Sequence, residues 1–209
     1  MNQEQDDAAA TMIDIRKLTL VNELGRLGTN GVADNLGMLA GSEAEMEVTK
    51  TNFIDVRDIK DHTDDGDRVG VRVRLQDQPH GHILVLFPED SAKKITGLML
   101  SDMVEDMNGV SSEMARSAIT ELGNMMVSGF IDGWADVLGR SIDHATPQLV
   151  YAPAGEIIER TAELGDQSLA LMFDSNISVP ASDIDADIYA LPDIGEFVQM
   201  INTLNARRQ

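Results

Sequence analysis

Hydrophobic and polar positions follow two different periods along the chain. From Ile13 to a glycine stop at Gly41, apolar residues recur every three or four positions, which predicts a helix. The next segments predict strands, the last two paired as a hairpin. Residues 43–56 and 69–75 alternate apolar and polar positions, and residues 82–87 form an apolar run. A proline and two acidic residues at 88–90 then predict the start of another helix.

The second half of the chain shows the same order of patterns. Residues 112–139 predict a long helix that ends in a glycine. Alternating or apolar segments predict extended structure at three places: residues 145–152, 167–175 and 186–191. Residues 192–208 predict a closing helix with basic residues in its last turn, where they complement the helix dipole.

A shift of 98 positions superimposes the first half on the second, because Glu23 then meets Glu121 and Gly31 meets Gly129. Chance could produce matches between residues that are common in helices. It explains less well why the predicted elements follow the same order in both halves, which a duplication would explain. We expect a single α+β domain at 13–206, with two pseudo-twofold-related α/β repeats sharing a central, mostly antiparallel sheet. The expected limits of the repeats and of a flexible acidic tail are 13–107, 111–206 and 1–12.

Composition adds a strong negative charge to this picture. The chain has 36 Asp and Glu against 16 Lys and Arg, for a formal net charge of −20. Such a surface repels nucleic acid and anionic membranes, while the apolar content argues against disorder for most of the chain. Adaptation to a salt-rich cytoplasm and an acidic surface in a mesophile are the two explanations of this charge.

The sequence contains no cysteine, which excludes disulfides, thiolate metal sites and cysteine nucleophiles. No apolar run approaches the ~18 residues of a membrane span. The acidic, polar first residues do not resemble a signal peptide. We therefore expect a cytoplasmic protein without nucleic-acid binding or membrane insertion.

Two short motifs superficially suggest metal ligands. Residues 61–67 look like a calcium loop, but Thr63 stands where an acid or amide is expected and Arg72 takes the place of the bidentate Glu. His80 and His82 flank a glycine beside a proline, which is more typical of a turn. We expect an exposed loop and a hairpin turn at these places, and no metal site.

One face of the helix at 112–139 carries aligned polar side chains. Ser117, Glu121 and Asn124 lie four and three residues apart and therefore share a face. The apolar residues on or near the opposite side are expected to face the core: Ile119, Leu122 and Met126. A carboxylate can engage a cation, and an amide can hold a water molecule in one orientation. A solvated helix face is the simpler explanation of these polar residues taken alone.

The pattern extends to a distant proline. Pro147 follows Asn124 after 22 residues, and Ser117, Glu121, Asn124 and Pro147 together resemble the signature of the CheC/CheX/FliY chemotaxis phosphatases, most of all CheC. The resemblance covers about residues 13–206 and implies a duplicated α/β unit. The acidic, lysine-poor composition then suggests a haloarchaeal member. A chance motif in an unrelated acidic α+β protein is the alternative.

The resemblance implies hydrolysis of the aspartyl phosphate on the response regulator CheY. In this family the Glu pairs with a CheY lysine and the Asn orients the attacking water, so Glu121 and Asn124 are the candidate catalytic residues. Ser117 and Pro147 would shape the site. Mg²⁺ would come from the regulator, so the resemblance implies no cofactor of the protein's own. Phosphoryl transfer needs chiefly positioning and charge stabilisation, for which such a site is adequate.

The resemblance also leaves an alternative function open. Family members bind the receptor deamidase CheD, so a non-enzymatic adaptor for CheY or CheD is the alternative to an enzyme. The first half carries a degenerate copy of the motif, at Thr19, Glu23, Arg26 and Thr49. Because a guanidinium only donates hydrogen bonds, Arg26 cannot accept one from water as the asparagine does. We therefore expect one intact site, and whether the first site still binds CheY is a separate question.

If the charge of −20 is a salt adaptation, the melting temperature should rise steeply with KCl. Repulsion between exposed acids is screened at a Debye length of ~3 Å in 1 M salt and persists at ~30 Å in 0.01 M. Chloride suits this measurement because sulfate also strengthens apolar burial by exclusion from the surface. A melting temperature that stays flat from low to molar KCl would contradict the salt adaptation.

Overall fold

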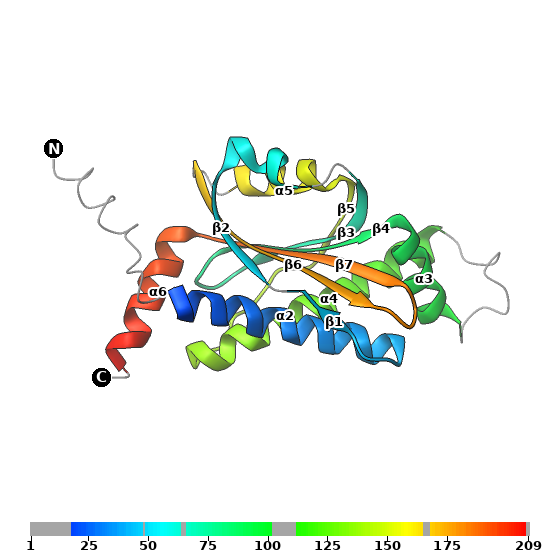
Figure 1. Cartoon of the computed structure of the whole chain (residues 1–209), viewed down its shortest axis with the longest axis horizontal. Coiled ribbons are helices and arrows are strands. Elements are labelled where there is room, and N and C mark those ends of the chain that lie inside the picture. The colour runs from blue at the N-terminus through cyan, green and yellow to red at the C-terminus, as the bar shows by residue number, and fades with distance from the viewer. Residues whose placement is uncertain (1–17, 48, 64–65, 102–111, 165–167, 208–209) are drawn as a thin grey trace.

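A seven-stranded sheet forms the middle layer of the protein, in a computed structural model that describes residues 18–47, 49–63, 66–101, 112–164 and 168–207 (Figure 1). Its strands are ordered β1-β6-β7-β4-β3-β5, and β2 also pairs with β6. Every one of these pairs is antiparallel. Helices α2 and α4 cover one face of the sheet, and α5 and the 3-10 helix η2 cover the other. The α+β class and the antiparallel sheet expected from the sequence are confirmed.

Apart from the short β1, which has no counterpart in the described part of the second half, the elements follow one another in the same order in both halves, with the 3-10 helix η2 at the place of α5. Those of the first half are α2 (Leu18–Ala40), β1 (Glu45–Met46), β2 (Lys50–Asp55), η2 (Val56–His62), β3 (Asp67–Leu75), β4 (Gly81–Pro88) and α3 (Glu89–Leu100). Those of the second half are α4 (Ser112–Leu138), β5 (Gln148–Pro153), α5 (Ala154–Glu163), β6 (Leu169–Val179), β7 (Ile184–Pro192) and α6 (Ile194–Arg207). Strands β2 and β5 each pair with the other half, on β6 and β3. A common origin of the halves stays a prediction.

Several sequence-based expectations need correction. The strand predicted over 43–56 is two strands, and its last residue, Val56, begins the 3-10 helix η2. That helix runs to His62, so it also takes the first residues of the loop predicted at 61–67. Helix α5 was not anticipated, although its apolar residues Ile157, Ile158 and Ala162 recur at helical spacing on its buried face. The tail predicted at 1–12 lies outside the described residues, and so does the start of the first helix.

Two apolar cores lie on the two faces of the sheet. The larger core fills the space between the sheet and the helices α2 and α4, and the smaller one lies under α5 and η2. Four aromatic rings meet in the larger core, with centroids 5.2–5.7 Å apart: Phe130, Trp134, Phe173 and Phe197. The indole Nε1 of Trp134 donates a hydrogen bond to the Leu24 carbonyl at 3.0 Å, so this ring also joins α4 to α2.

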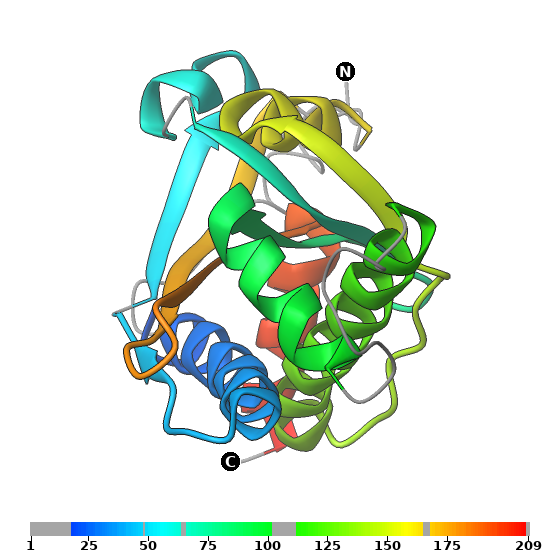
Figure 2. The same cartoon turned by 90° about the vertical axis from the view of Figure 1, so that its right-hand side faces the viewer.

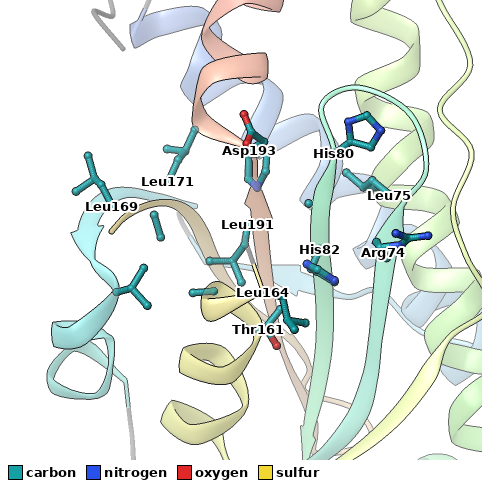
Figure 3. A pocket seen from close by; sticks show the side chains of 15 residues that line it. Arg74, Leu75, His80, His82, Thr161, Leu164, Leu169, Leu171, Leu191 and Asp193 are labelled. Carbon is teal, nitrogen blue, oxygen red and sulfur yellow. The ribbon is translucent and has the colours of Figure 1, made fainter. Parts of the chain in front are cut away.

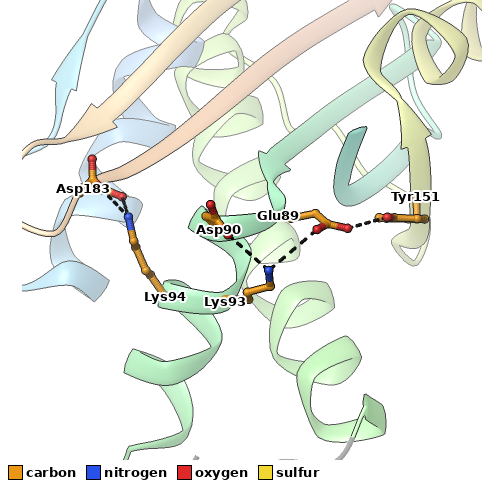
Figure 4. Close-up of polar contacts among 6 residues, drawn as sticks. All are labelled: Glu89, Asp90, Lys93, Lys94, Tyr151 and Asp183. Carbon is orange, nitrogen blue, oxygen red and sulfur yellow. Dashed lines mark hydrogen bonds and ion pairs between the residues drawn. The ribbon is translucent and has the colours of Figure 1, made fainter. Parts of the chain in front are cut away.

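Polar contacts fix α3 at one end of the sheet (Figure 4). Lys94 Nζ donates to the backbone carbonyl of Asp183 at 2.6 Å and also pairs with its carboxylate, in the turn between β6 and β7. At the other side of α3, the Tyr151 hydroxyl of β5 donates to Glu89 at 2.5 Å. Helix α3 is therefore tied to strands of the second half at both sides.

Helices α2 and α4 run antiparallel and touch backbone to backbone, as Figures 1 and 2 both show them side by side. A Cβ added to Gly31 would lie 2.1 Å from the Gly129 carbonyl oxygen, and one on Gly133 would lie 2.5 Å from that of Leu27. Asn35 Nδ2 donates to the Met125 carbonyl at 2.7 Å in the same interface. Side chains larger than hydrogen are therefore excluded at the point of crossing.

The substitution Gly31→Ala should destabilise the protein, because its methyl group would overlap the Gly129 backbone. Overpacking typically costs about 1–3 kcal/mol, which corresponds to a fall of roughly 2–12 °C in melting temperature for a chain of this length. The matched control is Gly195→Ala in α6, where an added Cβ would meet only Asp193 Oδ1 at 3.4 Å. Equal melting temperatures for both variants in molar KCl would contradict the close packing.

Candidate functional site

Helix α4 presents the predicted site residues to solvent. Ser117 and Glu121 are exposed, and Asn124 is half-buried. The residues predicted to face the core are all buried: Ile119, Leu122 and Met126. The division of α4 into a polar stripe and an apolar face is thus confirmed.

Gly123, between the two candidate catalytic residues, sets the position of this stripe. A Cβ on Gly123 would lie 2.2 Å from Val71 Cγ2, so α4 rests directly on β3 at this point. Val71 pairs with Leu149 of the edge strand β5, and Pro147 comes two residues earlier, just before that strand begins. Helix α4 also contacts β5. Pro147 therefore lies at the start of an edge strand whose partner, β3, supports α4 at Gly123, between Glu121 and Asn124.

The side chains of Glu121 and Asn124 are not engaged within the described part of the chain. Neither forms a hydrogen bond or an ion pair with another described residue, whereas the Asn124 carbonyl oxygen accepts one from Ser128 Oγ at 2.9 Å. A carboxylate and an amide are thus presented one helical turn apart on a fixed backbone. Such groups can meet a cation and a water molecule on a docked partner.

His144 lies close to this stripe and was missed in the sequence. Its Nε2 is 3.4 Å from Ser128 Oγ, one turn beyond Asn124, and its Nδ1 is 3.1 Å from the Ala145 carbonyl oxygen. A hollow of about 300 Å³ opens beside it, lined by Ser128, Asp132 and other residues. The contact between His144 and Ser128 depends on a bridge from His144 to Leu75 of β3, which the sequence does not reveal. The one signal in the sequence was that His144 lies three residues before Pro147.

The first-half copy of the motif has a different local structure. Thr19, Glu23 and Arg26 are exposed on α2, and no ion pair joins Glu23 to Arg26. Thr49, at the proline position, is instead part of the interior contacts of α2. Its Oγ1 lies 3.2 Å from Thr29 Oγ1 and 3.4 Å from Ser175 Oγ.

The two histidines of the hairpin are placed separately. His80 Nδ1 lies 2.8 Å from Glu196 Oε2, and the same carboxylate oxygen accepts the His80 backbone N–H. Burial, together with the charges of Arg72 and Arg74, lowers the pKa of His82 to about 4. Among the described residues, no three His, Asp or Glu side chains gather in a group that could hold a metal ion. The exposed loop predicted at 61–67 lies partly outside the described residues.

The comparisons with known proteins place the chain in a family. The model of the CheC-like family matches residues 114–151, which include Ser117, Glu121, Asn124 and Pro147. The CheC1 protein of Halobacterium salinarum, named as a candidate CheY-P phosphatase, is 47% identical over 195 residues, covering 93% of this chain and 100% of the relative. The CheY-P phosphatase CheC of Bacillus subtilis is 18% identical over 200 residues, 91% of this chain and 94% of its own. This protein belongs to the CheC family.

Solved structures share the fold. Thermotoga maritima FliY superimposes with a TM-score of 0.70 at 16% identity, over 95% of this chain and 100% of FliY. A chain of the CheX–CheY–BeF₃–Mg²⁺ complex from Borrelia burgdorferi gives a TM-score of 0.54 at 18% identity, over 79% and 96% of the two chains. At these identities the likeness concerns the fold alone. Within the described residues, no helix combines the length and apolar character needed to cross a membrane.

Proposed function

We propose that this protein is a phosphatase that hydrolyses the aspartyl phosphate of the response regulator CheY. The observation that carries the proposal is the pair Glu121 and Asn124, presented one turn apart without partners among the described residues. Support comes from the 47% identity to CheC1 and from the B. subtilis relative, whose name assigns this activity to that protein.

In the proposed mechanism, Glu121 docks the regulator by pairing with a lysine beside its phosphorylated aspartate. The Asn124 amide accepts a hydrogen bond from a water molecule and holds it in line with phosphorus. The water oxygen forms a bond to phosphorus, the bond from phosphorus to the aspartyl oxygen breaks, and the water protons end on the released phosphate and solvent. Positioning of this kind supplies most of the catalysis in phosphoryl transfer.

Mg²⁺ enters this mechanism as a component of the regulator. The complex of CheX with CheY from B. burgdorferi contains Mg²⁺ and BeF₃ by its description, and we propose the same division of parts here. The residues of the phosphatase then bind the regulator and orient the attacking water, while groups of the regulator neutralise the charge on the phosphoryl group. Ser117 and Pro147 border the stripe and shape the surface on which the regulator docks.

The two halves would contribute unequally to this activity. On α2, Glu23 occupies the docking position, but Arg26 has no acceptor with which to hold a water molecule. Thr49 is drawn into contacts with Thr29 and Ser175 and does not border an open stripe as Pro147 does. We propose that turnover occurs at the α4 site.

Asn124→Ala should slow dephosphorylation of CheY by about 100-fold, because displacement of a reacting group by about 1 Å can cost that much. The helix should survive, since alanine is a good helix former. Phosphate release from phosphorylated CheY of the same organism, in molar KCl, measures the effect. Asp136→Ala, an exposed change on another face of α4, is the control. Normal turnover by a folded Asn124→Ala protein would remove the amide from the mechanism, whereas the absence of phosphate release by the unaltered protein would favour an adaptor for CheY or CheD.

Glu23→Ala should reduce turnover much less than Glu121→Ala, although both residues are exposed at corresponding positions of paired helices. The reason is that the first site lacks the amide that orients water. Steady-state phosphate release by the two variants under one set of conditions gives the comparison. Equal losses would mean that the first site also turns over substrate. Arg26→Asn tests the same point in reverse, by a gain of activity in a Glu121→Ala background.

A further inference from the structure

A pocket of about 320 Å³ lies on the face of the sheet opposite α2 and α4, away from the polar stripe of α4 (Figure 3). It is formed where the β3–β4 hairpin, the end of α5, the start of β6 and the end of β7 meet. A volume of this size is at the lower end of the range for small-ligand sites, which combine apolar walls with a few placed polar groups. None of the residues assigned to the phosphatase stripe lines it.

The mouth of the pocket is apolar and exposed. Leu164 is 56% exposed and Leu169 is 39% exposed, and both line the pocket together with the buried Leu191. Exposed leucines gathered at one concavity cost hydrophobic free energy, which a bound aliphatic group would recover by covering them. The walls therefore suit a short aliphatic body.

Two nitrogen-bearing side chains stand beside this apolar wall without partners. Arg74 and His82 are directly opposite each other in the β3–β4 pairing, and Leu191 pairs with His82 from the other side. Neither side chain forms a hydrogen bond or an ion pair with another described residue. By contrast, two other arginines on the same face of β3 are engaged: Arg68 with Asp187, and Arg72 with Gln148.

The charges around Arg74 and His82 favour one kind of ligand. Arg74 supplies a positive charge beside His82, and burial together with the charges of Arg72 and Arg74 lowers the pKa of His82 to about 4, so that its imidazole is neutral at pH 7. At the other end of the pocket, Asp193 accepts the Glu196 backbone N–H at 2.8 Å as a cap of α6. Figure 3 shows Asp193 above His82. The negative charge of the Asp193 carboxylate disfavours a ligand that carries two negative charges.

We infer that this pocket binds a small monocarboxylate with a short aliphatic body, its carboxylate held by Arg74 and His82 and its body against the leucines. The guanidinium offers paired donors that match the two carboxylate oxygens, and the imidazole, neutral at pH 7, adds one N–H. In a salt-rich medium chloride competes for the guanidinium, whereas the aliphatic body gains from burial. The apolar wall thus makes the carboxylate preferred over a simple anion.

The test is a titration of the full-length protein with 3-methylbutanoate at pH 7 and fixed molar KCl. The imidazole signals are followed by NMR, and His82 is assigned with His82→Gln. We expect a shift of the His82 signal with a dissociation constant of about 1–10 mM, as suits a ligand of so few atoms. The uncharged 3-methylbutanamide, acetate and inorganic phosphate should each bind at least about 10-fold more weakly.

Matched variants locate the binding. Arg74→Gln should weaken binding of 3-methylbutanoate by about 10-fold or more, whereas Arg140→Gln, which is exposed and lies outside the pocket lining, should leave it unchanged. Both are surface changes, and far-UV circular dichroism checks the fold. No shift of the His82 signal up to 50 mM ligand, equal binding of the amide, or equal effects of the two variants would each overturn the inference. Phosphatase activity does not enter this test, so its outcome is independent of the proposed function.

Discussion

The backbone contact between α2 and α4 is the constraint on which the rest of the structure depends. Because Gly31 and Gly129 meet without side chains between them, the two helices lie closer than any pair with larger residues could. The contact fixes the rotation of each helix about its own axis as well as its position. Rotation decides which residues of α4 face the core and which face solvent. The contact at Gly129, about one and a half turns after Asn124, thus directs the polar stripe with Glu121 and Asn124 toward solvent.

A second close contact fixes the same stripe against the sheet. Gly123 lets α4 rest on Val71, and Val71 is paired with the edge strand that Pro147 precedes. The candidate site therefore depends on small residues on one helix and on the register of two strands. A rigid backbone of this kind suits chemistry that requires orientation and little else, because loose positioning would lose most of the rate.

The sequence predicted the features that depend on local periodicity. Strict alternation at 69–75 and the apolar run at 82–87 identified the β3–β4 hairpin, and the three-to-four spacing of Ile119, Leu122 and Met126 identified the buried face of α4. Contacts that depend on which residues of two strands lie opposite each other were not predicted. His144 reaches the stripe through a bridge to Leu75, and Arg74 meets His82 across the hairpin. Helix α5 was overlooked although its Ile157, Ile158 and Ala162 recur at helical spacing, whereas the seven residues of η2 are too few to distinguish a 3-10 helix from a loop.

The exchange of edge strands between the halves has a consequence for how such a chain can arise and fold. Strand β2 finds its partner in β6 of the second half, and β5 finds its partner in β3 of the first, so neither half contains the neighbours of its own outer strand. Half of this chain on its own would expose unpaired strand edges, which proteins avoid because such edges aggregate. A single-repeat ancestor with this pairing would have needed a second copy of itself to complete the sheet, as a strand-exchanged dimer. Joining the two copies in one chain would then have freed each half to change separately, which is the condition under which one site can lose its asparagine while the other keeps it.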